Sequence, residues 1–337
     1  MKNLSLLLLM LLPFLGFAQE SAETLSLNAG WSFSQAGKDT WYEAQVPGSV
    51  QHDLIRHKVL PDPFYGTNEK LIQWVEDENW DFKKTFTVPA ELLNRDDAIL
   101  FFEGLDTQAD VYLNGSRILR SENMFIGHKV SVKNILKEGE NMLYIRFYSP
   151  VQSLMPARIT AGYDYPAGND HRDEKLSVYN RKAPYHFGWD WGIRIAQMGS
   201  WKPVSLVFYD KARIDDFYVK QQSVTVQSAK IDNIVEAFSV AEKPVSATVT
   251  VEYAVKGEAK KSVSKEVTLH PGKNTVSIPL EITDPKRWMP TGWGEQYLYD
   301  FTATVTVDNR IIAEKSERVG LRTVRLVQEP DEHGKSF

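Results

Sequence analysis

Apolar and polar side chains alternate with a period of two along much of this sequence, and this pattern limits the fold more than any other feature. From Thr248 to Tyr253 valine and tyrosine alternate with threonine and glutamate, and Tyr299–Val307 repeats the pattern. Successive side chains of a β-strand point to opposite faces, so such segments form strands with one face buried and the other in water. Long amphipathic helical windows are absent. We therefore predict an all-β protein.

Turn residues divide the predicted strands into two domains. Asp110–Leu119 predicts a hairpin, because Asn114 and Gly115 accept the positive φ angles of a type I′ turn at little steric cost. The chain has 337 residues, more than one domain usually holds. We expect a β-sandwich in 22–210 and an immunoglobulin-like β-sandwich in 212–325. Turn signals that space the strands of the second domain lie at Lys256-Gly257, His270–Gly272 and Asp308-Asn309.

Residues 1–18 have the pattern of a signal peptide. Lys2 precedes an apolar run from Leu4 to Leu15, and the run ends in the small-x-small pattern before Gln19 that signal peptidase recognises. This run is shorter than the roughly 20 residues of a spanning helix, and no second apolar segment follows it. An uncleaved amphipathic anchor is the alternative. We expect cleavage after Ala18 and an exported chain, periplasmic or secreted, without a membrane span.

Composition and motif content exclude several classes of function. The chain has no cysteine, which rules out disulfide scaffolds, thiolate catalysis and cysteine-ligated metals. The net charge is −5 and the lysines and arginines are scattered, so we expect no nucleic-acid partner. The complete phosphate-binding loop, Gly-x-x-x-x-Gly-Lys-Ser/Thr, and the nucleophile motif Gly-x-Ser-x-Gly are absent. The seven histidines show no ligand spacing, and Asn169–Glu174 around His171 favours a solvated loop over a cation site. We expect no metal and no cofactor.

Two long stretches, 46–80 and 149–199, lack strand alternation, and loops of this length serve a site or an interface. In the second stretch Asp190 lies between Trp189 and Trp191. A carboxylate between two indoles can bind sugar hydroxyls while the rings stack on the sugar's apolar face. The alternative is a structural aspartate that caps backbone N–H groups beneath core tryptophans, and the residues alone leave both open.

Glycoside cleavage requires two carboxyl groups that flank the scissile bond. Glu295, in a Trp-Gly-Glu-Gln-Tyr sequence, poses the same choice as Asp190, and there a turn that enters a strand is favoured. The sequence places no second carboxylate against either residue. The residues alone therefore show no convincing acid/base pair in this chain.

Several longer motifs carry a family resemblance. The most specific is Arg181–Gly192, which ends in Phe-Gly-Trp-Asp-Trp-Gly. Other matching segments are Val46–Val50, Pro61–Glu69, Asn79–Phe82, Phe102–Asp106, Val111–Gly115, Arg287–Tyr299 and Val319–Val324. Together they resemble glycoside hydrolase family 2 in its β-mannosidase branch, from about Leu25 to the end of the chain.

The resemblance implies an ordered domain plan. A jelly-roll, galactose-binding-like sugar-binding domain occupies 22–210, and an immunoglobulin-like β-sandwich follows in 212–325. A (β/α)₈ barrel, which needs about 250 residues, then carries both catalytic glutamates. Residues 326–337 would be the truncated lead-in to that barrel, with a structureless polar tail. We expect the barrel in cis in the complete protein and no hydrolysis by the 337 residues alone.

The resemblance also implies a substrate. The complete protein would be a retaining exo-β-mannosidase that removes terminal, non-reducing β-D-mannose from β-mannosides and manno-oligosaccharides. Trp189, Asp190 and Trp191 are implied to contact this substrate, with Asp190 holding hydroxyls of the terminal mannose. One alternative is a non-catalytic carbohydrate-binding protein. Another is a β-galactosidase or β-glucuronidase of the same family, against which the Trp-Asp-Trp sequence argues.

Overall fold

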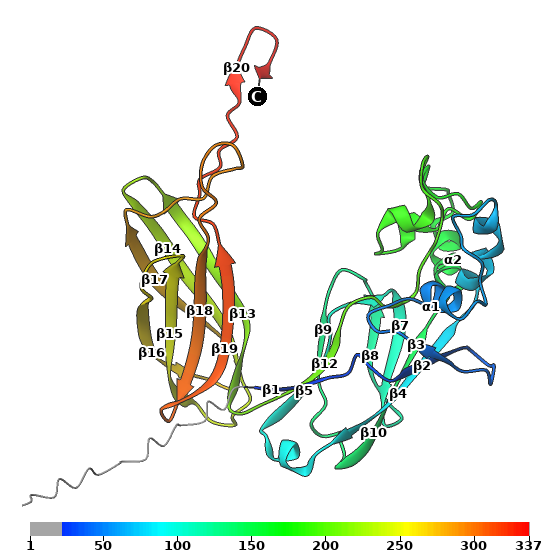
Figure 1. Cartoon of the computed structure of the whole chain (residues 1–337), viewed down its shortest axis with the longest axis horizontal. Coiled ribbons are helices and arrows are strands. Elements are labelled where there is room, and N and C mark those ends of the chain that lie inside the picture. Colours follow the sequence, from blue (N-terminus) through cyan, green and yellow to red (C-terminus); the bar gives the residue numbers. More distant parts are fainter. Residues whose placement is uncertain (1–21, 337) are drawn as a thin grey trace, which may run out of the picture. The chain divides into compact units, whose positions relative to one another are not determined.

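The computed structural model describes residues 22–336, so the predicted signal peptide lies outside the described residues. The chain divides into two units, one of which is Ala22–Lys211 while the other contains the residues from Ala212 onward. Both are built mainly from antiparallel strands (Figure 1). The prediction of an all-β protein is confirmed. Between residues 22 and 336, no helix has the length and apolarity needed to cross a membrane.

The first unit is a β-sandwich. One sheet has the strand order β1 (Glu23–Ser26), β12 (Val204–Tyr209), β5 (Asp97–Phe102) and β9 (His128–Ser131). The other has the order β3 (Tyr42–Ala44), β2 (Trp31–Gln35), β4 (Trp80–Val88), β10 (Gly139–Phe147), β7 (Gln108–Leu113) and β8 (Ser116–Glu122). A short ladder pairs β6 (Leu105–Asp106) with β11 (Gly199–Ser200).

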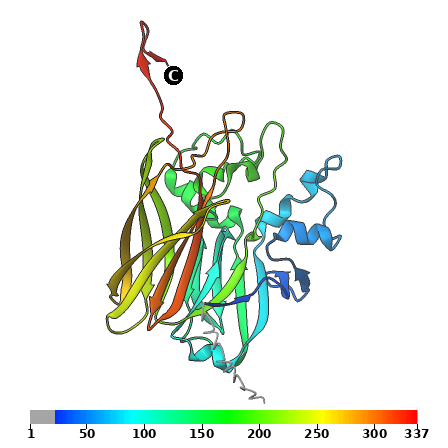
Figure 2. The same ribbon diagram turned by 60° about the vertical axis from the view of Figure 1, so that its left-hand side comes forward.

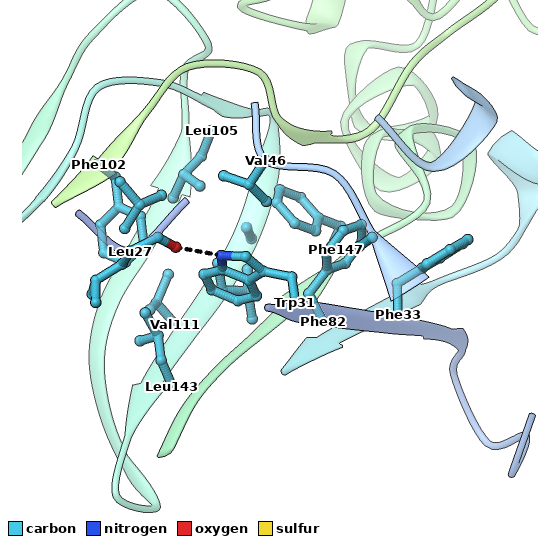
Figure 3. Packing of buried hydrophobic residues seen from close by; sticks show 14 of the residues in the cluster. Leu27, Trp31, Phe33, Val46, Phe82, Phe102, Leu105, Val111, Leu143 and Phe147 are labelled. Carbon is cyan, nitrogen blue, oxygen red and sulfur yellow. Dashed lines mark hydrogen bonds between the residues drawn. The ribbon is translucent and has the colours of Figure 1, made fainter. Parts of the chain in front are cut away.

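The core of this sandwich packs around the buried indole of Trp31 on β2 (Figure 3). Its N–H donates a 2.6 Å hydrogen bond to the carbonyl of Leu27, so the ring is buried without losing its polar partner. Phe82 and Phe147 come from β4 and β10 and meet edge to face at 5.3 Å, while Phe102 comes from β5 in the other sheet. Burial of each ring contributes roughly 1.5–3 kcal/mol, and together the rings join the two sheets.

The predicted hairpin joins β7 to β8. Asn114 and Gly115 have φ angles of 51° and 85°, the left-handed values that the turn requires. The strand pair contains one register shift, between Val111 and Tyr112. The hairpin prediction is therefore confirmed. It could be made from sequence because the turn depends on two adjacent residues that accept positive φ angles.

The stretches 46–80 and 149–199 are more ordered than the sequence suggested. They contain α1 (Val50–Arg56), η1 (Asn68–Leu71), η2 (Gln73–Asp77), α2 (Pro150–Ala161), η4 (Ser177–Tyr179) and η5 (Pro184–Phe187), and η3 (Ala90–Asn94) follows β4. Ser149 caps α2 by accepting hydrogen bonds from the N–H groups of Val151 and Gln152, and Gly162 ends it at φ 73°. The apolar residues of α2 do not gather on one face, and each of the other helices has at most seven residues, so periodicity did not reveal them. Figures 1 and 2 show α1 and α2 with their loops at one end of the sandwich.

The second unit is a sandwich of longer strands. One sheet has the order β13 (Ala212–Val224), β14 (Ser228–Ser239) and β17 (Gly272–Thr283). The other has the order β16 (Lys261–Leu269), β15 (Val245–Val255), β18 (Tyr299–Val307) and β19 (Arg310–Val319). Val249, Val251, Phe301 and Val305 are fully buried, as the alternation predicted.

The C-terminal tail forms a small hairpin in which β20 (Glu329–Pro330) pairs with β21 (Lys335–Ser336). The expectation of a structureless tail is therefore wrong. Asp331 closes the turn: its N–H donates to the Gly334 carbonyl at 3.0 Å and its carboxylate accepts from the His333 N–H at 2.9 Å. Aspartate often stabilises a turn through hydrogen bonds of this kind to its own local backbone.

Candidate functional site

Asp190 and Trp191 form the tip of a tight turn between Trp189 and Gly192. The backbone N–H of Trp189 donates to the Gly192 carbonyl and the N–H of Gly192 donates to the Trp189 carbonyl, both at 3.2 Å. Gly188 enters the turn with φ 105°, and a Cβ there would lie 2.6 Å from the ring of His171. Only glycine allows both this backbone angle and this close approach.

The side chains of the turn point into solvent. Trp191 is 83% exposed and Trp189 is 43% exposed, and their rings meet edge to face with centroids 5.5 Å apart. Asp190 is exposed as well, and in the described part of the chain it makes no hydrogen bond or ion pair. The structural alternative, an aspartate capping backbone beneath core tryptophans, is therefore wrong. The turn instead offers a free carboxylate beside two indole faces, a combination that can bind hydroxyl groups and a flat apolar surface.

A buried ion pair holds the segment that carries the turn. The Lys182 ammonium pairs with Asp106 of β6 and donates a 2.8 Å hydrogen bond to the Gln197 carbonyl. Burial lowers the pKa of Lys182, and the Asp106 carboxylate opposes that shift. Because Lys182 precedes the turn and Gln197 follows it, one ammonium group ties the two ends of the segment to the sandwich.

Arg194 fixes the exit of the turn. Its guanidinium is 3% exposed and pairs with the buried carboxylates of Glu76 and Asp170, the latter at 3.3 Å. Its Nη1 also donates to Gln73 Oε1 at 3.0 Å, and its backbone N–H donates to Glu69 Oε1 at 2.8 Å. Burial raises the pKa of Glu76 even though neighbouring guanidinium groups act in the opposite direction. The helices η1 and η2 thus supply all of these acceptors except Asp170.

The run 169–174 belongs to the same charge network. Asp170 is 1% exposed, and Arg172 lies 2.6 Å from Glu76, 2.8 Å from Asp77 and 3.1 Å from Glu174. The prediction of a solvated charged loop is wrong for Asp170 and Arg172. Asp170 pairs with Arg194, which follows the turn, and Arg172 pairs with Glu76, which also contacts Arg194. Within residues 22–336 no group of three or more histidine, aspartate or glutamate side chains is placed to hold a metal ion.

A pocket of about 460 Å³ lies next to the Lys182–Asp106 ion pair. Its walls include Asp106, Tyr185, His186 and Trp201. The Nδ1 atom of His186 lies 4.0 Å from Asp106 Oδ2. Burial, and then the positive charge of Lys182, lower the pKa of His186 to about 4. The imidazole is therefore neutral near pH 7, and the pocket combines a neutral donor or acceptor with aromatic walls.

The structure brings together the three residues that the sequence singled out, Trp189, Asp190 and Trp191, and adds supports that sequence reasoning missed. Lys182 and Arg194 are the missed supports, and both flank the turn at its two ends. One signal was available: both are charged residues inside or next to the motif Arg181–Gly192. Their partners Asp106 and Glu76 are distant in sequence, so pairing could not be deduced from spacing.

Comparison with known proteins decides the family. Residues 31–202 match the family model described as the glycosyl hydrolase 2 galactose-binding domain-like domain, and residues 212–322 match the model of glycosyl hydrolases family 2. The chain belongs to glycoside hydrolase family 2. The two matched regions coincide with the jelly-roll-like and immunoglobulin-like sandwiches described above.

The relatives of this family 2 chain are longer proteins. A β-mannosidase B of Thermothelomyces thermophilus is 35% identical over 317 residues, which is 91% of this chain and 35% of the relative. The crystal structure of a β-D-mannosidase from Dictyoglomus thermophilum superposes with a TM-score of 0.85 at 37% identity, over 94% of this chain and 38% of that one. The crystal structure of an exo-chitosanase from Amycolatopsis orientalis, at 19% identity, TM-score 0.70 and coverage of 93% of this chain and 35% of that one, shares the fold alone. The chain spans about a third of the length of the curated relatives it matches.

Proposed function

We propose that these two domains are the N-terminal part of a retaining exo-β-mannosidase that removes terminal β-D-mannose from β-mannosides and manno-oligosaccharides. The observation that carries the proposal is the turn Trp189–Gly192, which presents an unpaired carboxylate between two exposed indoles. The similarity to the named β-mannosidases supports the choice of sugar.

In this proposal the turn contributes binding energy and not bond cleavage. The Asp190 carboxylate accepts hydrogen bonds from two hydroxyls of the terminal sugar, and the indoles of Trp189 and Trp191 cover its C–H face. The buried ion pairs of Lys182 and Arg194 keep the turn in one conformation, which reduces the entropy lost when the sugar binds. Both catalytic glutamates belong to a barrel in cis, where they cleave the glycosidic bond through a covalent mannosyl intermediate.

The proposal includes export. The sequence of residues 1–18 supports secretion to the periplasm or the exterior with cleavage after Ala18. N-terminal sequencing of the mature protein is then expected to start at Gln19, and an N-terminus that retains Lys2 would contradict cleavage.

The test compares two aspartate variants in the polypeptide that joins this chain to its barrel. Asp190→Asn keeps the shape of the side chain and removes its charge, and we expect kcat/KM for an aryl β-mannoside to fall roughly ten- to a hundredfold. Asp173→Asn, an exposed aspartate of the same domain, is the matched control and should leave kcat/KM unchanged. If Asp190→Asn and the parent have equal kcat/KM, Asp190 does not contact the substrate.

Two further measurements separate the alternatives. The 337-residue chain alone should hydrolyse no aryl β-mannoside, and turnover free of contaminants would show that catalytic residues lie within it. Calorimetry of this chain with millimolar mannose or mannobiose tests the alternative that it is a non-catalytic carbohydrate-binding protein. Such a protein would bind the sugar without a barrel. Faster cleavage of an aryl β-galactoside or β-glucuronide than of the β-mannoside would favour the sister activities.

A further inference from the structure

The pocket next to the Lys182–Asp106 ion pair has no role in the proposed function, and much of its wall is aromatic. Phe125 and Tyr185 line it and are 60% and 68% exposed, and Trp201, which also lines it, is 36% exposed. Its volume of about 460 Å³ lies in the range of small-molecule sites, which combine mainly apolar walls with a few polar groups. The pocket therefore presents ring surface that a ligand can cover.

Two of these rings are carried by firmly held backbone. Trp201 donates from Nε1 to the Met124 carbonyl at 3.1 Å, and its indole lies so close to Gly104 that a Cβ there would be 2.5 Å from that nitrogen. The N–H of Met124 donates to the Arg181 carbonyl at 3.1 Å, which ties down the strip that leads into Phe125. A preformed wall reduces the entropy lost when a ligand binds.

The polar groups open to this pocket are uncharged. Gln197 and Tyr185 line it, and among residues 22–336 neither the amide nor the phenol hydroxyl has a hydrogen-bond partner. Asp106 also lines the pocket, but its carboxylate is buried and paired with Lys182. An amide and a phenol can both donate and accept hydrogen bonds, as sugar hydroxyls do. This combination favours a neutral, hydroxylated ligand with an apolar face over an ion.

The pocket lies at the base of the turn that carries Asp190. His186 and Ile195, which both line the pocket, are joined by a 3.0 Å hydrogen bond from the Ile195 N–H to the His186 carbonyl. Trp189 and Gly192 close the turn three residues further along on each side. Three residues of chain span at most about 11 Å. An oligosaccharide of two or three linked rings can extend from the tip of the turn to its base.

We propose that the pocket walled by Phe125, Tyr185 and Trp201 binds an inner sugar ring of a manno-oligosaccharide whose terminal mannose is bound at Asp190. This inference rests on the proposed function and adds to it a preference for oligosaccharides over simple mannosides. The aromatic rings cover the C–H face of the inner sugar, and the Gln197 amide binds its hydroxyls. Substrates too short to reach the pocket gain nothing from it.

The test compares substrates of two lengths in the polypeptide that joins this chain to its barrel. Methyl β-mannoside has no second ring, whereas β-1,4-mannotriose has two inner rings. Tyr185→Ala and Phe125→Ala each remove one wall of the pocket, and we expect kcat/KM for mannotriose to fall about tenfold while that for methyl β-mannoside changes by less than about twofold. Tyr185→Phe keeps the ring and should retain most of the activity on mannotriose.

Tyr218→Ala is the matched control, because this tyrosine is 56% exposed and belongs to the second unit. It should leave kcat/KM for both substrates unchanged, and circular dichroism verifies that every variant is folded. Equal losses on the two substrates would show a structural role, such as contact with the barrel, and would overturn the inference. Unchanged activity on mannotriose in both alanine variants of the pocket would overturn it too. A parent that cleaves neither mannoside would overturn the proposed function together with this inference, whereas the preceding outcomes leave the proposed function intact.

Discussion

Replacing Arg194 by methionine would remove the positive charge that two buried carboxylates share. Glu76 and Asp170 are 2% and 1% exposed, and the guanidinium that pairs with both is itself almost fully buried. Methionine fills a similar volume without offering a donor, so the change isolates the charge from the packing. Arg172 still contacts Glu76 in the variant, whereas Asp170 loses its side-chain cation.

The magnitude follows from the burial of these groups. Removal of one partner from a buried ion pair costs about 3–5 kcal/mol, because the remaining charge is left uncompensated in a region of low dielectric constant. In a domain of this size 1 kcal/mol shifts the melting temperature by roughly 2–4 °C. We therefore expect the transition of the first unit to fall by about 6–20 °C at pH 7.

The pH dependence provides an independent check on the cause. Burial already raises the pKa of Glu76 in the folded state, and loss of Arg194 should raise it further. A raised folded-state pKa contributes stability that is fully present below the unfolded pKa and is lost as pH rises through the folded value. The difference between variant and parent should accordingly shrink as pH is lowered from 7 toward about 4.5, the ordinary value of glutamate.

Calorimetry or thermal circular dichroism across this pH range measures both effects. Arg158→Met is the control, since Arg158 forms a partly exposed pair with Asp164 whose side chain is 68% exposed, and such pairs contribute about 0–1 kcal/mol. An Arg194→Met variant that melts within 2 °C of the parent, a shift of less than about 1 kcal/mol, would refute the argument. A difference that stays constant with pH would attribute the loss to packing and not to charge.

Three further predictions follow from the first unit. Trp31→Phe should destabilise it by about 2–4 kcal/mol in urea unfolding, because the Leu27 carbonyl loses its donor and a cavity forms; a loss below about 1 kcal/mol would contradict this. Gly188→Ala should destabilise the first unit by about 1–3 kcal/mol and change its tryptophan fluorescence, since φ is 105° there and the added Cβ would meet His171. Gly37→Ala is the control, because φ is 80° there but no atom lies near the added Cβ, so it measures the backbone cost alone. Burial lowers the pKa of His186 to about 4, so between pH 6.5 and 4 the unfolded chain binds a proton that the folded chain does not. Over that range the free energy of unfolding of the parent should fall by roughly 2–3 kcal/mol more than that of His186→Gln. Parallel pH profiles of the urea midpoints of the two proteins would rule this out.

Patterns local in sequence predicted much of this protein. Alternation at 248–253 and 299–307 predicted strands with one buried face, and Asn114-Gly115 predicted the hairpin between β7 and β8. Each of these depends on the chemistry of residues a few positions apart, which a single sequence displays in full. The motif Arg181–Gly192 likewise carried the three residues proposed to bind sugar, because they are adjacent in the chain.

Only the tertiary structure decided what Asp190 can do and what supports it. The residues alone left a capping role open, and the folded chain rejects it because the carboxylate and both indoles face solvent. The supports are pairs such as Lys182 with Asp106 and Arg194 with Glu76, separated by 76 and 118 positions (182 − 106 and 194 − 76). Such pairs form because folding removes each charge from water and places opposite charges from distant segments beside it, and sequence spacing does not show which segments these are.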